Sequence, residues 1–120
     1  MLETTVGVFT GTHVFGELAG VRAGLLDDEQ FLRTTMNNAL YAAGATVCEV
    51  VSKRFEPQGV TVLALLSESH ASVHTYPEIG SAFVDVFTCG DRADPGMAVR
   101  LLATALGAAD SRVTSLRRGV

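Results

Sequence analysis

The sequence predicts an α+β fold: a two-layer sandwich in which an antiparallel sheet of about five or six strands carries two main helices on one face. Several short runs rich in β-branched residues are separated by turn residues, and two segments repeat apolar residues at helical spacing. The 120 residues fit a single domain, residues 1–120. With 48% hydrophobic and 18% charged residues, the composition is that of an ordinary globular protein.

The first third of the chain predicts a strand followed by a helix. Gly11–Val21 is the first expected strand. Asp27 or Asp28 can cap the helix, because an aspartate side chain accepts hydrogen bonds from the free N–H groups of a first turn. Gly44 ends the helix, since glycine readily adopts the left-handed conformation found there. The apolar residues at helical spacing are Leu32, Met36, Ala39, Leu40 and Ala43.

The middle of the chain predicts four strands. Thr46–Phe55 is rich in valine and precedes a turn at Glu56–Gly59. Val60–Leu66 is almost wholly apolar, which is typical of a strand buried in a sheet. Two further strand-like runs follow, Ser69–Tyr76 and Ser81–Cys89.

A second helix and a last strand complete the predicted fold. Asp94 can cap the helix, and Pro95 suits its first position because proline lacks the N–H that would be unpaired there. Gly107 ends this helix, and Ser111–Leu116 is the last expected strand. The apolar stripe of the helix consists of Val99, Leu102, Ala103 and Leu106.

Charge and hydropathy argue against two classes of partner. The net charge is −4 and no stretch gathers five basic residues, which disfavours nucleic-acid binding. No apolar run reaches 18 residues, so we expect no membrane-spanning helix. Cys48 and Cys89 form no Cys-x-x-Cys motif, and the N-terminal residues do not resemble a signal segment. We therefore expect a cytoplasmic protein with reduced thiols.

The segment Leu65–Glu78 gathers hydroxyl, imidazole and carboxylate side chains around a predicted strand. His70 and His74 are four residues apart, a spacing that on a helix would point both rings at one metal ion. On a strand the two rings lie about 13 Å apart, at roughly 3.3 Å per residue. We therefore expect no metal site here.

Ser69 has a carbonyl group within reach, that of Glu68. No Gly-x-Ser-x-Gly motif surrounds Ser69, which argues against a hydrolase nucleophile. Its hydroxyl can instead attack the Glu68 carbonyl carbon and convert the peptide bond to an ester. If a base then removes the Ser69 α-proton, the ester is eliminated, and the remaining dehydroalanine hydrolyses to a pyruvoyl group. The pyruvoyl ketone would form a Schiff base with a substrate amine and act as an electron sink.

Several motifs together resemble those of the bacterial S-adenosylmethionine decarboxylase proenzymes. They are Glu68-Ser69-His70, His74-Thr75, Pro77-Glu78, the run Asp85–Gly90, Gly11-Thr12-His13 and the Phe55-x-Pro57-x-Gly59 turn. The resemblance covers roughly Gly11 to Gly107, most of the chain. It implies a pyruvoyl-dependent enzyme that cleaves itself between Glu68 and Ser69 and makes the aminopropyl donor for spermidine.

The resemblance also implies a role for each matched residue in the chemistry. Cleavage would divide the chain into residues 1–68 and 69–120, and Ser69 would become the pyruvoyl group. His74 would be the base of this processing step. Cys89 would protonate the substrate carbon after carbon dioxide leaves, a task for which a thiol is a competent acid.

Three matched residues would bind S-adenosylmethionine. Phe55 and Tyr76 would sandwich the adenine, and Glu78 would bind the ribose hydroxyls. Members of the family are dimers of the cleaved unit with residues of both subunits near the site, so a homodimer is implied. Tyr76 stands where the family usually has Trp, and Thr61 where it usually has Ser.

Other interpretations stay open from the sequence alone. The same cofactor serves other amines, so the substrate could instead be a basic amino acid such as ornithine or arginine. An unprocessed, non-catalytic partner subunit is a further alternative, although the chain retains every residue that processing needs. Considered singly, Phe55 could belong to the core, Tyr76 could be a cross-strand partner and Glu78 could be a solvated turn residue.

Overall fold

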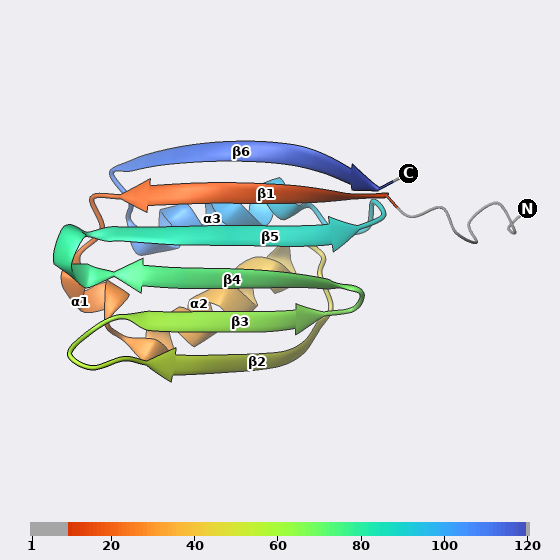
Figure 1. The fold of residues 1–120 in the computed structure, drawn as a ribbon. Helices are drawn as coiled ribbons and strands as arrows, with labels where there is room; N and C mark the ends of the chain where they lie inside the picture. The colour runs from red at the N-terminus through yellow and green to blue at the C-terminus, as the bar shows by residue number, and fades with distance from the viewer. Residues whose placement is uncertain (1–9, 120) are drawn as a thin grey trace, which may run out of the picture.

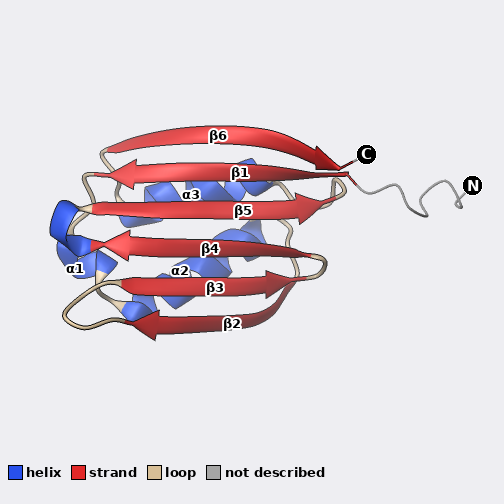
Figure 2. Cartoon of the chain, in the orientation of Figure 1, coloured by secondary structure: helices blue, strands red, loops and turns tan. Residues whose placement is uncertain are grey.

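The computed structural model describes residues 10–119, which form one six-stranded antiparallel sheet with the two main helices on one face (Figures 1 and 2). The strand order is β2-β3-β4-β5-β1-β6. The expected two-layer α+β sandwich is therefore confirmed. The elements are β1 (Thr10–Ala19), α1 (Ala23–Leu26), α2 (Glu29–Ala42), β2 (Val47–Arg54), β3 (Val60–Leu66), β4 (Ser69–Tyr76), a 3-10 helix (Pro77–Ile79), β5 (Ser81–Cys89), α3 (Pro95–Leu106) and β6 (Asp110–Gly119).

Both main helices begin at the capping residues that the sequence predicts. The Asp28 carboxylate accepts a hydrogen bond from the Phe31 N–H at 3.0 Å, and the Asp94 carboxylate accepts one from the Met97 N–H at 3.0 Å. Each bond satisfies an N–H that has no partner inside the helix. Pro95 occupies the first turn of α3, as expected.

The hydrophobic core lies between the helices and the inner face of the sheet. Alternate residues of each central strand point into it, because successive side chains of a strand point to opposite faces. The largest fully buried side chains are Leu18, Leu26, Met36, Leu40, Val60, Val62, Val73, Val86, Val99, Leu102 and Leu106.

No helix covers the other face of the sheet, which we call the open face (Figure 2). Six large apolar side chains on this face are between 40% and 53% exposed, a high fraction for residues in the middle of strands. Exposed apolar patches of this kind mark interaction surfaces in soluble proteins. The six residues are Phe15, Val51, Leu63, Leu65, Phe83 and Leu116.

Three details differ from the sequence-based expectation. β1 ends at Ala19, because Gly20 has a φ of +70° and turns the chain. β6 runs from Asp110 to Gly119, longer than expected, since it pairs with β1 along its whole length. The short helix α1 was not expected; its four residues are too few to show a helical repeat. Within residues 10–119, no helix is long and apolar enough to cross a membrane.

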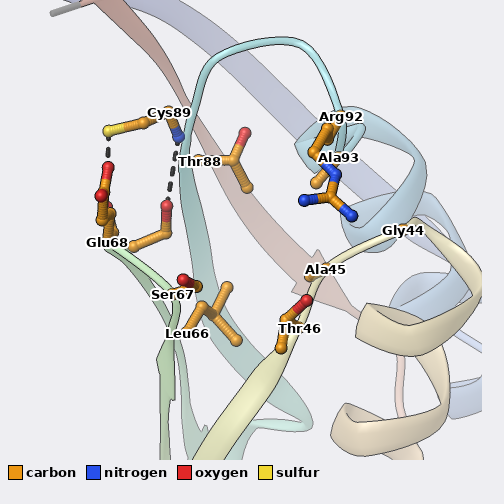
Figure 3. A pocket seen from close by; sticks show the side chains of 11 residues that line it. Gly44, Ala45, Thr46, Leu66, Ser67, Glu68, Thr88, Cys89, Arg92 and Ala93 are labelled. Atoms are coloured by element: carbon orange, nitrogen blue, oxygen red, sulfur yellow. Dashed lines mark hydrogen bonds between the residues drawn. The ribbon is translucent and has the colours of Figure 1, made fainter.

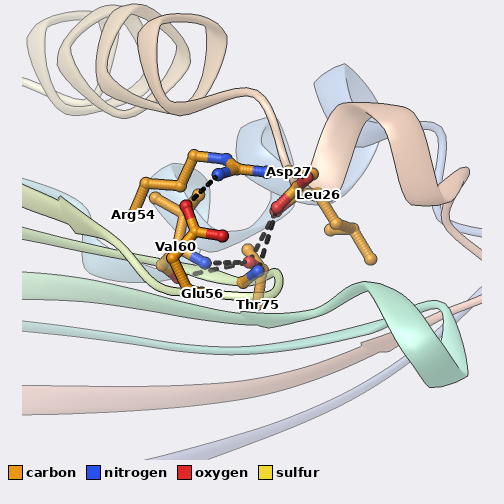
Figure 4. Close-up of polar contacts among 7 residues, drawn as sticks. Leu26, Asp27, Arg54, Glu56, Val60 and Thr75 are labelled. Atoms are coloured by element: carbon orange, nitrogen blue, oxygen red, sulfur yellow. Dashed lines mark hydrogen bonds and ion pairs between the residues drawn. The ribbon is translucent and has the colours of Figure 1, made fainter.

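Thr75 joins three elements at one end of the sheet (Figure 4). Its hydroxyl donates to the Leu26 carbonyl at 2.6 Å and accepts from the Val60 N–H at 2.8 Å. Nearby, Asp27 accepts from the Gly59 N–H at 2.9 Å and from Arg54 at 2.6 Å. The Gly59 N–H, followed by the Arg54 guanidinium, holds the pKa of Asp27 below its ordinary value. These bonds hold the β2–β3 turn against α1 and β4.

Candidate active site

The two-residue turn between β3 and β4 holds Glu68 in an unusual backbone conformation. Its φ is +62°, in the left-handed region that residues with a Cβ rarely occupy. Such conformations cost about 1–3 kcal/mol and collect at functional sites. The strain therefore lies in the backbone of Glu68, the residue whose carbonyl group forms the peptide bond to Ser69.

Cys89, the last residue of β5, contacts both sides of this peptide bond (Figure 3). Its backbone N–H donates to the Ser69 hydroxyl oxygen at 3.1 Å, and its thiol donates to the Glu68 carbonyl oxygen at 3.4 Å. The sheet places it there, because β4 and β5 pair in antiparallel register along their length. A hydroxyl, a carbonyl and a hydrogen-bonding thiol thus meet at one point.

The remaining predicted site residues lie elsewhere on the chain. His74 is on the open face of β4, where its Nδ1 lies 3.0 Å from the Thr61 hydroxyl. Tyr76 packs on Phe83 of β5, with ring centroids 5.1 Å apart. Phe55 is exposed in the β2–β3 turn, and Glu78 is exposed on the 3-10 helix.

The predicted residues therefore form two groups at opposite ends of the sheet. Figure 1 shows the β3–β4 turn and the end of β5 on one side, and the β2–β3 turn and the 3-10 helix on the other. At roughly 3.3 Å per residue, His74 lies about 17 Å along β4 from Ser69, and Tyr76 lies about 23 Å from it. A single chain does not bring the two groups together.

Asp85 is the centre of a polar network on the open face. Its carboxylate accepts hydrogen bonds from the Ser72 hydroxyl, from His13 Nε2 at 2.6 Å and from His70 Nε2 at 3.3 Å. Burial alone would raise the pKa of Asp85, but the bonds from Ser72 and His13 and the nearby imidazoles outweigh it and lower that pKa. The carboxylate therefore stays ionised at neutral pH.

His13, His70 and Asp85 also form a group whose ligand atoms lie within 4.8 Å of one another. Arg118 determines which ring nitrogen of His13 carries the hydrogen, because its guanidinium lies 3.1 Å from His13 Nδ1 and can only donate. Nδ1 must then accept, so Nε2 carries the hydrogen and donates to Asp85. A nitrogen that carries hydrogen cannot ligate a metal, and the group is best described as a hydrogen-bond network.

A cavity of about 240 Å³ adjoins the Glu68–Ser69 peptide (Figure 3). It is bounded by the β3–β4 turn, the end of β5, the α2–β2 loop and the β5–α3 loop. Thr88 and Arg92 line it beside Glu68 and Ser69. Neither Thr88 nor Arg92 was singled out from the sequence.

A two-layer α+β sandwich with a serine hydroxyl and a cysteine thiol held at a strained peptide bond defines a candidate self-processing enzyme. The sequence model of the family described as S-adenosylmethionine decarboxylase matches residues 12–119. The chain therefore belongs to the S-adenosylmethionine decarboxylase family.

Individual relatives agree with this assignment. The S-adenosylmethionine decarboxylase proenzyme of Prochlorococcus marinus (strain MIT 9313) is 52% identical over 90% of this chain and 86% of its own length. That of Brevibacillus brevis is 47% identical, over 92% of this chain and 83% of its own. The crystal structure of the adenosylmethionine decarboxylase from Aquifex aeolicus VF5 superposes with a TM-score of 0.87 at 33% identity, covering 94% of this chain and 93% of that one.

Proposed function

We propose that this chain is a self-processing, pyruvoyl-dependent S-adenosylmethionine decarboxylase that supplies the aminopropyl donor for spermidine synthesis. The observation that carries the proposal is the strained Glu68–Ser69 peptide with the Cys89 N–H and thiol held against it. Relatives named S-adenosylmethionine decarboxylase proenzyme favour this substrate over ornithine or arginine, and an active enzyme over a non-catalytic subunit.

The contacts at Glu68 support self-cleavage. When the Ser69 hydroxyl attacks the Glu68 carbonyl carbon, negative charge develops on the carbonyl oxygen. The Cys89 thiol already donates to that oxygen, and a donor placed in advance stabilises the charge. The left-handed φ of Glu68 strains the intact turn, and cleavage after Glu68 removes the chain connection that imposes this conformation.

The same residues fit a pyruvoyl group formed from Ser69. That group would supply a ketone, which accepts the electrons released when the substrate loses carbon dioxide. The Cys89 thiol lies beside the position of Ser69 and is half-exposed, so it can deliver a proton to a substrate carbon bound there. We assign this proton transfer to Cys89.

The separation of the two groups of residues supports a homodimer. Processing needs a base, and His74 of the same chain lies about 17 Å from Ser69. A two-fold axis parallel to the plane of the sheet and perpendicular to its strands would turn the open faces toward each other and lay the His74 end of one subunit over the Ser69 end of its partner. His74, Phe55, Tyr76 and Glu78 of the partner subunit would then complete each site.

This dimer would also cover the open face. The six apolar side chains there would leave water, which favours association. Phe55 and Tyr76 would be brought to the adenine, since a base stacked on an aromatic ring gains about 1–3 kcal/mol. Glu78 would accept hydrogen bonds from the ribose hydroxyls, and an ionised acceptor strengthens such bonds.

Denaturing mass spectrometry tests the self-cleavage. Purified protein should give two fragments, residues 1–68 and 69–120, with the second fragment blocked by a ketone instead of an amine. Ser69→Ala should stay intact, and His74→Ala should stop at the ester, which hydroxylamine cleaves. A wild-type chain that stays whole after prolonged incubation contradicts the proposal.

Carbon dioxide release tests the substrate. Processed protein is given S-adenosylmethionine, ornithine or arginine, and kcat/KM is compared. We expect S-adenosylmethionine to be preferred, because the other two carry no purine or ribose for Phe55, Tyr76 and Glu78. A higher kcat/KM for ornithine or arginine would reverse the substrate assignment and leave the processing chemistry intact.

The unpaired thiols of Cys48 and Cys89 support a cytoplasmic location as part of this proposal.

A further inference from the structure

Backbone contacts fix the walls of the cavity beside Glu68. The Asp94 N–H donates to the Ala43 carbonyl at 2.9 Å, which holds the β5–α3 loop against the end of α2. A Cβ on Gly44 would lie 2.9 Å from the Arg92 carbonyl oxygen, so glycine permits the two loops to approach this closely. The cavity is thus part of the folded structure and is not a gap between loosely placed loops.

Two residues that line this cavity each carry a group that suits an anion and has no partner among residues 10–119. The Thr88 hydroxyl is buried, at 3% exposure, and has no hydrogen-bond partner among residues 10–119. An unpaired buried hydroxyl is costly, and natural structures rarely retain one. The Arg92 side chain makes no hydrogen bond or ion pair with any described residue. Figure 3 shows it reaching from the β5–α3 loop into the cavity.

Cleavage would create an anion at this place. Elimination breaks the bond between Oγ and Cβ of Ser69, so both ester oxygens stay with Glu68 as a new α-carboxylate, and the α-proton of Ser69 passes to the base. Glu68 already lines the cavity, beside Thr88 and Arg92. A guanidinium and a hydroxyl together match a carboxylate in charge and in hydrogen-bonding capacity.

We propose that this cavity is the binding site for the α-carboxylate that Glu68 acquires on cleavage, held by Arg92 and Thr88. The inference rests on the proposed self-cleavage. Docking of the carboxylate withdraws the Glu68 oxygens from the Cys89 thiol, which in the uncut chain donates to the Glu68 carbonyl. The thiol is thereby released for its second task, proton transfer to the substrate.

Thermal unfolding of cut and uncut protein tests this site, with Ser69→Ala as the uncut background. Thr88→Val should raise the Tm of the uncut protein by about 1–4 °C, because it removes an unpaired buried hydroxyl, and should lower the Tm of the processed protein by a similar amount. Arg92→Gln should lower the Tm of the processed protein by about 2–5 °C and leave the uncut protein unchanged. Arg100→Gln, which removes an exposed charge on α3, is the matched control and should change neither.

Carbon-13 NMR observes the carboxylate itself. With glutamate labelled at the α-carboxyl carbon, Glu68 is the one glutamate that carries a free α-carboxylate after cleavage, since every other glutamate is followed by a peptide bond. Its signal at pH 7 should move on Arg92→Gln and Thr88→Val and stay in place on Arg100→Gln.

The outcomes separate the sources of the anion. The proposal is overturned if the Glu68 α-carboxylate signal does not move on Arg92→Gln. It is also overturned if Thr88→Val lowers the Tm of both the cut and the uncut protein. If Arg92→Gln raises the KM for S-adenosylmethionine at least tenfold with no effect on either Tm, the cavity binds the substrate carboxylate instead. A wild-type chain that shows one intact mass and no α-carboxylate signal overturns the proposed function along with this inference.

Discussion

Glu68 and Cys89 show how the fold brings together two residues that are far apart in sequence. The turn strains the Glu68 backbone, and β5 brings the Cys89 thiol to 3.4 Å from the Glu68 carbonyl oxygen. In the proposed reaction, the thiol would thus serve cleavage as well as turnover. A residue assigned to proton transfer alone would not need this contact in the uncut chain.

We predict that Cys89→Ala slows self-cleavage as well as decarboxylation. Loss of a donor to a developing oxyanion reduces rates, and a thiol is a weak donor, so we expect cleavage to slow roughly tenfold. The measurement is the fraction of cut chain over time after synthesis. Cys48→Ala, which changes an exposed cysteine on β2, is the control and should cleave at the wild-type rate. If Cys89→Ala cleaves itself at the wild-type rate, the Cys89 thiol has no role in cleavage and acts only in decarboxylation.

Asp85 illustrates a residue whose role depends on its charge. Its lowered pKa means that the folded state stabilises the ionised carboxylate. The resulting stability is fully present above the unfolded pKa, about 3.9, and is lost as the pH falls through the lower folded pKa.

We predict that Asp85→Asn lowers the free energy of unfolding by about 1–3 kcal/mol at pH 7, because hydrogen bonds to a charged acceptor are lost. The difference from wild type should shrink below about pH 4 as the wild-type carboxylate is protonated. Urea unfolding at pH 7 and pH 3 measures both values, with exposed Asp91→Asn as the control. An equal difference at the two pH values would show that charge is not the cause.

At the scale of single residues, the sequence identified those site residues that stand in contiguous motifs. It did not identify residues that meet only because two strands pair. Glu68, Ser69 and Cys89 stand in recognisable motifs. Arg118 meets His13 across 105 positions, and that contact depends on β6 pairing with β1 in one register. Thr88 was quoted within a motif, but its unpaired hydroxyl became visible only once the residues around it were placed.

At the scale of elements, the end of the sheet that carries Phe55, Tyr76 and Glu78 depends on a few buried hydrogen bonds. The Thr75 hydroxyl bonds to backbone groups of Leu26 and Val60 at once, so it fixes α1 and β3 relative to β4. The β2–β3 turn bearing Phe55 is held beside it through Asp27.

We predict that Thr75→Val lowers the free energy of unfolding by about 1–3 kcal/mol, since valine has the same shape but leaves the Val60 N–H unpaired in a buried place. Because the turn that carries Phe55 loosens, KM should rise more than kcat falls. Urea unfolding and steady-state kinetics measure these effects, with exposed Thr104→Val on α3 as the control. A stability equal to that of Thr104→Val would show that the Thr75 bonds contribute nothing.

Most elements were predictable because their signals are local. Capping aspartates, terminal glycines and alternating valines act within a few residues, and the expected helices and strands follow them closely. The length of β6 was not predictable from its residues, because all ten are exposed and most of them are polar or small. The extent of this strand is set by its hydrogen bonds to β1. The short α1 is likewise held by contacts with distant residues, among them Thr75.

At the scale of the whole molecule, the open face is the surface through which we propose that the chain assembles. Helices protect one side of the sheet, and the other side exposes apolar residues in the middle of β1, β3 and β5. Sequence patterns could not indicate which face lacks helices, because both faces of the central strands carry apolar residues. The separation of the site into two groups was equally hidden, since it follows from the direction of β4 and from the position of the turns.

We predict that Leu63→Glu dissociates the proposed dimer, because a charge in the middle of the open face would be buried there without a partner. Val113→Glu is a close control, since Val113 is 48% exposed and Leu63 is 45% exposed, but Val113 lies on the other face of β6. Light scattering gives the mass, and mass spectrometry gives the extent of cleavage. Leu63→Glu should be a monomer that cleaves poorly, and a dimeric Leu63→Glu that cleaves normally would place the interface elsewhere.

In the proposed dimer, the position of Ser69 and His74 at different places along β4 would have a genetic consequence. A cell that carries one allele with Ser69→Ala and another with His74→Ala should regain activity, although neither allele works alone. In a mixed dimer, one site would join an intact Ser69 to an intact His74, and the other site would lack both. With random assortment of subunits, about a quarter of the wild-type number of sites should be functional. Two alleles altered at Ser69 and Cys89 should not complement each other, because those two residues serve the same site from the same chain.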